Sequence, residues 1–198
     1  MYPLLFSGRA LYAITFWATY GLWLVLELSA SRKKRSGDFS RKQDRGSLRL
    51  ILILFWLGIS LGFTFSYFFP QLAIRWNRSL VFFIGIVLML AGIAFRRYAM
   101  AVLGQFFTYD VAVHTDQKVI DLGPYRYIRH PSYSGALLTQ IGLGLALGNW
   151  ASLAILVICT GLAYVYRISI EEQALVAALG EPYKEYMART HRLIPFFF

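Results

Sequence analysis

The chain has 198 residues, of which 58% are hydrophobic and 15% are charged, and its formal net charge is +10. A soluble domain carries roughly a quarter of charged residues, and the long apolar runs of this chain exceed what one small core can bury in water. The composition therefore excludes a soluble enzyme, and with a single cysteine, Cys159, it excludes a disulfide-stabilised secreted domain. It indicates a protein whose solvent is a lipid bilayer.

The basic residues are concentrated in one short polar segment. Eight of them lie in residues 31–49, between two apolar runs. Positive charge in a short loop holds that loop on the cytoplasmic face, beside anionic lipid. The net charge is thereby explained by the membrane, and we expect no nucleic-acid partner.

Three apolar runs in the first half have the length of membrane spans. They cover residues 4–30, 48–69 and 79–101. Each reaches the roughly 20 residues that a helix needs to cross about 30 Å of hydrocarbon. The sequence therefore predicts three transmembrane helices.

The second half alternates polar and apolar segments. Residues 102–134 are polar and predict a loop at the membrane surface, whereas residues 133–147 and 150–166 are apolar and are separated by the turn signal Gly148-Asn149. Both arms are short, which favours a tight helical hairpin and about five transmembrane helices in all. Residues 169–189 predict an amphipathic helix, broken between Gly180 and Pro182.

Two kinds of cofactor site are excluded by spacing. The glycines of GLGLALG, residues 142–148, follow no strand and lie in an apolar run, so they indicate close helix packing and no Rossmann fold. His114, His130 and His191 are far apart in the sequence, and we expect no metal site.

Two polar motifs carry the chemistry: GPYRYIRHPSYSG at residues 123–135 and RISIEE at residues 167–172. Pro131 disfavours helix at His130 and can begin a helix behind it. Arg167 and Glu171 lie four residues apart, on one face of a helix. If the hairpin folds back, the two motifs meet at one membrane depth.

Taken singly, each of these residues could serve only to anchor the protein at the membrane surface. Arg126 and Arg129 are suited to lipid headgroups, the tyrosines to an interfacial belt, and Arg167 with Glu171 to a stabilising pair. The density of polar groups beside an apolar groove favours a binding site, because anchoring does not require their desolvation.

These motifs, together with GEPYKEYMARTHRLIP at residues 180–195, resemble the isoprenylcysteine carboxyl methyltransferase family. The resemblance covers about the last hundred residues. It implies an all-α integral membrane protein with a cytosolic cofactor pocket that is closed by the C-terminal segment. It also implies two regions: residues 1–101, a scaffold of three transmembrane helices, and residues 102–198, a catalytic region with a cofactor-binding loop, the hairpin and the amphipathic helix.

The resemblance further implies the cofactor and the site. S-adenosylmethionine would be converted to S-adenosylhomocysteine as the carboxylate of a lipophilic acceptor, such as a prenylated cysteine, is methylated. Arg167 would bind the acceptor, and Arg167 with Glu171 would form the catalytic centre. The resemblance assigns cofactor contacts to Val113, His114, Lys118, Val119, Ile120, Tyr125, His130, Pro131, Ser132, Tyr133 and Glu171.

Carboxyl methylation suits these residue types, because a carboxylate is ionised at neutral pH and needs placement more than a base. The basic loop implies that the N-terminus is outside, with the C-terminus and the site in the cytosol. Three alternatives remain open. A phospholipid amine N-methyltransferase would need Tyr133, His130 or Glu172 as a base; the others are a sterol-reductase-like protein and a non-catalytic membrane scaffold.

Overall fold

The computed structural model describes residues 9–33, 46–109, 111 and 118–193, and the regular elements in these segments are helical. Single backbone bridges join Ala73 to Asn149 and Ile128 to His191. The α-helices are α1 (Ala10–Lys33), α3 (Ser47–Phe68), α4 (Arg78–Leu103), α5 (Pro131–Leu147), α6 (Trp150–Leu179) and α7 (Glu181–Arg189). Short 3₁₀ turns are η2 (Pro70–Leu72), η3 (Gly104–Phe106) and η4 (Gly123–Arg126).

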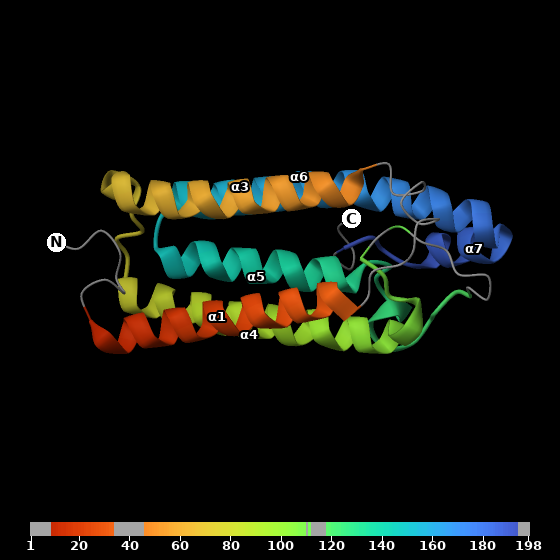
Figure 1. The fold of residues 1–198 in the computed structure, drawn as a ribbon, viewed down its shortest axis with the longest axis horizontal. Coiled ribbons are helices and arrows are strands. Elements are labelled where there is room, and N and C mark those ends of the chain that lie inside the picture. The colour runs from red at the N-terminus through yellow and green to blue at the C-terminus, as the bar shows by residue number, and fades with distance from the viewer. Residues whose placement is uncertain (1–8, 34–45, 110, 112–117, 194–198) are drawn as a thin grey trace.

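The long helices run side by side along the molecule. Figure 1 shows α5 between one layer of α3 and α6 and another of α1 and α4, with α7 at one end of the bundle. Among the described residues, four segments are long and apolar enough to cross a membrane: Ala10–Ala30, Ser47–Phe68, Arg78–Phe106 and Trp150–Leu179. The predicted all-α membrane architecture is confirmed.

Helix α5 is shorter than the four spans. It has 17 residues, which corresponds to about 25 Å of helix, and it packs against α4 and α6. The turn that precedes α6 forms as the sequence predicts. Gly148 has a left-handed φ of 67°, and the side chain of Asn149 accepts hydrogen bonds from the backbone amides of Ala151 and Ser152.

The second arm of the hairpin is longer than the predicted residues 150–166. Helix α6 continues without interruption through Arg167 to Leu179. It ends where Gly180 adopts a φ of 63°, and α7 begins at Glu181. Because no glycine or proline lies between Arg167 and Leu179, nothing in the backbone stops the helix there. The predicted break between Gly180 and Pro182 is confirmed, but the segment before it belongs to α6.

The closest helix contact joins α4 to α5 through glycines. A Cβ atom added to Gly85 of α4 would lie 2.5 Å from the backbone nitrogen of Ala146. One added to Gly142 of α5 would lie 2.5 Å from the backbone nitrogen of Met89. Since backbone atoms of the facing helix lie this close to both positions, a side chain of any size would separate the helices. Gly142 and Gly144 thus serve packing, as predicted, whereas a Cβ atom added to Gly148 would meet nothing within 4 Å and this glycine serves the turn.

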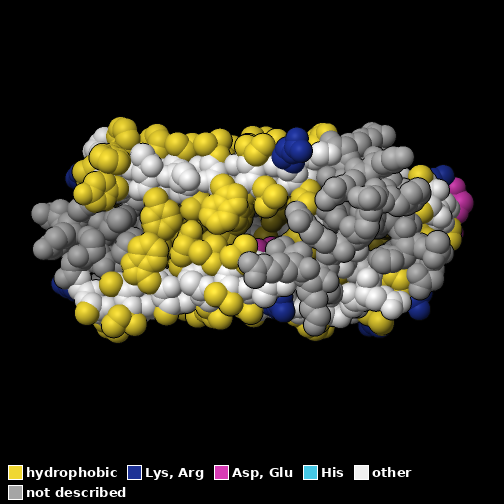
Figure 2. Space-filling model, viewed as in Figure 1, with side chains coloured by type: hydrophobic (Ala, Val, Ile, Leu, Met, Phe, Trp, Pro, Cys, Tyr) yellow, Lys and Arg dark blue, Asp and Glu magenta, His cyan; other side chains and the backbone are white. Residues whose placement is uncertain are grey.

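The outer surface of the bundle is apolar. Large side chains of α1 such as Leu11, Ile14 and Val25 are 64%, 68% and 65% exposed. Figure 2 shows hydrophobic side chains covering much of the face formed by α1 and α3. In water such a surface would cause aggregation, whereas in a bilayer it contacts lipid. The fold is that of an integral membrane protein with several spans.

Candidate active site

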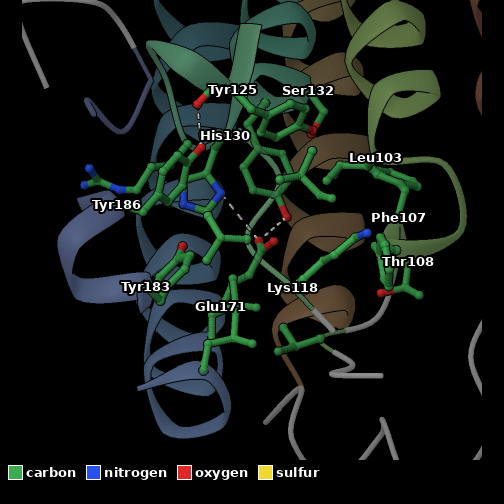
Figure 3. A pocket seen from close by; sticks show the side chains of 18 residues that line it. Leu103, Phe107, Thr108, Lys118, Tyr125, His130, Ser132, Glu171, Tyr183 and Tyr186 are labelled. Atoms are coloured by element: carbon green, nitrogen blue, oxygen red, sulfur yellow. Dashed lines mark hydrogen bonds and ion pairs between the residues drawn. The ribbon is translucent and has the colours of Figure 1, made fainter. Parts of the chain in front are cut away.

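One pocket lies at the end of the bundle that carries α7 (Figures 1 and 3). The space between its walls is about 820 Å³, open solvent at its mouth included. Its walls come from the end of α4 and the residues that follow, the start of α5, the end of α6, and α7. The lining residues are Leu103, Phe106, Phe107, Thr108, Val111, Lys118, Val119, Ile120, Tyr125, Arg129, His130, Ser132, Tyr133, Glu171, Leu175, Leu179, Tyr183 and Tyr186.

The two sequence motifs meet in this pocket. The Nδ1 atom of His130 lies 3.7 Å from Oε2 of Glu171, and its Nε2 atom lies 3.3 Å from Oε1 of Glu172. His130 precedes Pro131, the first residue of α5, and is only 4% exposed. The proline fixes the start of the helix, and the imidazole is thereby held against α6. The predicted meeting of the histidine-proline and arginine-glutamate motifs is confirmed.

The hydroxyl of Tyr133 connects the two polar groups of α6. It donates a hydrogen bond to Oε2 of Glu171 at 2.8 Å and accepts one from Nε of Arg167 at 3.3 Å. The Tyr133 ring stacks on the ring of His130 and on that of Tyr164, with centroid separations of 5.6 and 4.6 Å. These two stacking contacts leave the ring little freedom, so the hydroxyl occupies a fixed position beside Glu171.

Arg167 lies behind Tyr133 and does not line the pocket. It is 2% exposed. Its Nη1 atom donates to Oγ of Ser47 at 2.6 Å, and its Nη2 atom donates to the backbone carbonyl of Tyr109. The guanidinium therefore joins α6 to the start of α3 and to the segment that follows α4.

Glu172 holds the C-terminal segment against the motif of residues 123–135. One carboxylate oxygen, Oε1, accepts a hydrogen bond from Nε of Arg129 at 2.8 Å, and the other, Oε2, accepts one from Nε of Arg192 at 3.1 Å. The backbone amides of Arg129 and His130 donate to the carbonyls of His191 and Arg192. The last described residues thus pair directly with the loop that carries His130.

Helix α7 supplies a wall of the pocket through Tyr183 and Tyr186. The hydroxyl of Tyr186 donates to the backbone carbonyl of Tyr125 at 2.7 Å. Burial, reinforced by the negative charge of Glu171, raises the pKa of Tyr183 well above its usual value, and burial likewise raises the pKa of Tyr186. Both hydroxyls therefore stay protonated at physiological pH and act as hydrogen-bond donors.

Comparison with known proteins agrees with this site. The model of the isoprenylcysteine carboxyl methyltransferase (ICMT) family matches residues 84–177, which include the contacts of His130, Tyr133 and Glu171. The chain belongs to this family. A rice (Oryza sativa subsp. indica) protein named probable protein-S-isoprenylcysteine O-methyltransferase is 32% identical over 130 residues, which cover 65% of this chain and 66% of that protein.

Two further members extend the comparison. The Schizosaccharomyces pombe protein-S-isoprenylcysteine O-methyltransferase is 33% identical over 102 residues, which cover 50% of this chain and 43% of that protein. The solved structure of the eukaryotic intramembrane Ras methyltransferase ICMT superposes with a TM-score of 0.59 at 28% identity, covering 73% of this chain and 52% of that one. The match thus spans about two thirds or less of each of these ICMT proteins.

The pocket contains most of the cofactor contacts predicted from the sequence. These are Lys118, Val119, Ile120, Tyr125, His130, Ser132, Tyr133 and Glu171. Pro131 is buried in the first turn of α5 and is not part of the wall. Val113 and His114 lie outside the described residues. The roles of these residues toward a cofactor stay predictions.

The sequence motifs do not include the apolar side chains that line the pocket. Phe106, Phe107 and Val111 come from the segment after α4, and Leu175 and Leu179 from the last turns of α6. One signal was available for α6: Glu171, Leu175 and Leu179 recur at intervals of four, which places them on one helix face. The described residues contain no group of histidine, cysteine and acidic side chains that could hold a metal ion.

Proposed function

We propose that this chain is an S-adenosylmethionine-dependent methyltransferase that esterifies the carboxylate of a lipophilic, prenylcysteine-like acceptor. The observation that carries the proposal is the meeting of His130, Tyr133 and Glu171 in one pocket at the end of a membrane-embedded bundle. Membership of the ICMT family supports the reaction class. The pocket adds a defined place for a small polar cofactor beside a lipid-facing surface.

The residues of the pocket fit S-adenosylmethionine. Glu171 supplies a carboxylate and Lys118 an ammonium group, which match the amino and carboxylate groups of an amino acid. Figure 3 shows the Glu171 carboxylate at the centre of the pocket, with His130 on one side and Lys118 on the other. The rings of Phe107 and Tyr183 offer apolar surface for a purine. When bound, this cofactor supplies a methyl group on a positively charged sulfur, which a carboxylate accepts without losing a proton.

We assign acceptor recognition to Arg167. Its guanidinium lies directly behind the Tyr133 hydroxyl, and its positive charge favours an anionic acceptor at that side of the pocket. Ser47 and the carbonyl of Tyr109 hold the guanidinium in place. Since the acceptor is already ionised, the neutral tyrosines of the pocket are suited to positioning it by hydrogen bonds.

The division of the chain and its orientation complete the proposal. Every residue that lines the pocket falls within residues 102–198, which supports a catalytic region behind a scaffold of residues 1–101. The basic residues between α1 and α3 support a cytosolic position for that connection. The N-terminus is then outside, and the pocket and the C-terminus are cytosolic.

Methyl transfer to a small prenylcysteine analogue tests the function. Purified protein in detergent is incubated with methyl-labelled S-adenosylmethionine and a farnesylated thio-acid, and the labelled product is treated with base. We expect a base-labile product, because a methyl ester is cleaved by base. A base-stable methylated lipid amine from native membranes, with no ester, would instead establish the N-methyltransferase alternative. No transfer and no cofactor binding would contradict the proposal.

The variant Glu171→Gln tests the proposed cofactor pocket. We expect S-adenosylhomocysteine to bind about 10-fold more weakly, because the amide removes the negative charge beside His130. Isothermal titration of the purified variant measures this. Glu181→Gln is the matched control: Glu181 is 74% exposed and pairs only with Lys184 among the contacts described. Equal affinities in the two variants would remove Glu171 from the site.

A further inference from the structure

A charged pair lies within the bundle, outside the pocket. Glu27 of α1 accepts hydrogen bonds from Arg96 of α4 on both carboxylate oxygens, at 3.0 Å from Nε and 2.6 Å from Nη2. The side chain of Arg96 is 10% exposed and that of Glu27 is 29% exposed. This is the two-pronged geometry in which arginine and carboxylate bind each other most firmly.

Arg96 also reaches the wall of the pocket. Its third nitrogen, Nη1, donates to the backbone carbonyl of Ser132 at 3.1 Å. Ser132 lines the pocket and is the second residue of α5, between His130 and Tyr133. A displacement of the Arg96 guanidinium would therefore shift the first turn of α5, which holds the rings of His130 and Tyr133 against α6.

A second contact joins Glu27 to the segment after α4, which supplies another wall of the pocket. The hydroxyl of Tyr109 donates to Oε1 of Glu27 at 3.1 Å, and burial raises the pKa of Tyr109 to about 12, so the donor stays protonated. The Tyr109 ring meets the ring of Phe107, which lines the pocket, and its backbone carbonyl accepts a hydrogen bond from Arg167. The Glu27 carboxylate thus contacts both Arg96, which binds the carbonyl of Ser132, and Tyr109, whose ring packs against Phe107.

The pair is not needed simply to attach α1 to the bundle. Elsewhere α1 packs through aromatic rings, including Phe16 against Phe63 and Trp23 against Phe55. Replacing a buried ion pair by apolar residues is often neutral or stabilising, so such a pair is weak evidence for stability. The pair lies at the pocket end of α1 and is hydrogen-bonded to two walls of the pocket. This placement indicates that it fixes the positions of those walls.

We propose that Glu27 is a positioning residue of the pocket. It fixes the Arg96 guanidinium and the Tyr109 hydroxyl, and through them sets the first turn of α5 and the segment that carries Phe107. The first transmembrane helix, none of whose described side chains lines the pocket, thereby shapes the cofactor site. The effect on S-adenosylhomocysteine binding rests on the proposed methyltransferase function, whereas the effect on the first turn of α5 does not.

The variant Glu27→Gln tests the inference. The amide presents N–H donors to a guanidinium that has only donors, so one prong of the pair is lost and Arg96 is free to shift. We expect S-adenosylhomocysteine to bind about 10-fold more weakly, with most of the affinity restored in Glu27→Asp. Hydrogen exchange of the amides of Tyr133 and Ser134 should be faster in Glu27→Gln, in the absence of any ligand.

Ser66→Ala is the matched control. Ser66 of α3 is 2% exposed and donates to the backbone carbonyl of Leu147, at the opposite end of α5. This change removes a buried hydrogen bond to the same helix, so it reports general destabilisation. We expect unchanged affinity for S-adenosylhomocysteine and unchanged exchange at Tyr133 and Ser134.

The outcomes separate this inference from the proposed function. Unchanged exchange at the start of α5 in folded Glu27→Gln protein would overturn the positioning role, and so would an equal change in Ser66→Ala. If the unaltered protein fails to bind S-adenosylhomocysteine, the proposed function fails, and the exchange comparison still decides the role of Glu27. If Glu27→Gln does not fold, Arg96→Lys, which loses the two-pronged contact with Glu27, is compared with Ser66→Ala by the same two measurements, and equal results would overturn the positioning role.

Discussion

At the scale of single residues, the polar groups of α6 divide into two roles. Glu171 lines the pocket, whereas Arg167 lies one helical turn earlier and is buried behind Tyr133. The spacing of four residues correctly predicts a shared helix face, whereas a joint contact of Arg167 and Glu171 with a ligand stays a prediction. It does not predict the Tyr133 hydroxyl that stands between them, because Tyr133 comes from another helix and its position depends on the tertiary fold.

The position of Arg167 leads to a prediction for Arg167→Lys. Lysine keeps the positive charge but not the planar fork of donors that Ser47, Tyr109 and Tyr133 share. We expect methyl transfer to fall about 100-fold while S-adenosylhomocysteine affinity changes by less than about 3-fold, since a small displacement near the reacting groups is costly. Turnover and calorimetric titration measure the two effects.

The control for this change is Arg97→Lys. Arg97 is exposed, next to Arg96 in the sequence, and the same substitution there should leave turnover unchanged. Turnover close to that of the unaltered protein in Arg167→Lys would end the assignment of acceptor recognition to Arg167. A large loss of cofactor affinity in Arg167→Lys would instead place it with the cofactor contacts.

At the scale of helices, the hydropathy of the sequence predicts that a helix is present better than it predicts where the helix ends. The apolar runs at residues 48–69 and 79–101 correspond closely to α3 (Ser47–Phe68) and α4 (Arg78–Leu103). The extent of α6 was underestimated, because hydropathy falls at Arg167 although the helix does not end there. The polar residues that follow are paired with Tyr133, Arg129 and other groups distant in sequence, and a hydropathy pattern contains no information about those partners.

The contact between α4 and α5 yields a prediction about packing. In Gly142→Ala, the new methyl group would lie 2.5 Å from the backbone nitrogen of Met89 and 2.6 Å from the carbonyl oxygen of Gly85. Backbone atoms cannot give way as a flexible side chain does, so we expect the free energy of unfolding to fall by about 2 kcal/mol. Thermal unfolding in detergent measures the change.

The same substitution at Gly161 is the control. A Cβ atom added to Gly161 of α6 meets nothing within 4 Å, and alanine is the better helix former. Gly161→Ala should therefore unfold at the same temperature as the unaltered protein or at a higher one. If Gly142→Ala behaved like Gly161→Ala, the two helices would be further apart than the structure places them.

At the scale of the whole molecule, the second half of the chain lines the pocket, and the first half contacts this lining region through Glu27 and Ser47. The motif residues were predictable because His130, Tyr133 and Glu171 lie in short ordered motifs. The lining from Phe106, Phe107 and Tyr183 was not, since apolar side chains beside a membrane look the same in sequence whether they face lipid or a ligand. The contact of α1 with the pocket through Glu27 depends on a bundle arrangement that no local pattern encodes.

The closure of the pocket gives a last prediction, for Glu172→Gln. Glu172 binds Arg129, His130 and Arg192 together, and an amide keeps one acceptor oxygen but replaces the other with a donor that faces Arg129 or Arg192. Breaking one partner of a buried ionic cluster is costly, and the least anchored member is the C-terminal segment with Arg192. We expect limited proteolysis to cut near residues 189–193 faster than in the unaltered protein.

Cofactor binding should change together with this cleavage, because the same segment pairs with the backbone of Arg129 and His130. S-adenosylhomocysteine should protect the unaltered protein from cleavage and protect Glu172→Gln less. Glu185→Gln, an exposed position on α7, is the control and should show normal cleavage and normal protection. If Glu172→Gln were cleaved and protected like Glu185→Gln, closure would depend on the tyrosines of α7, whose hydroxyl contact from Tyr186 to Tyr125 joins the same two segments.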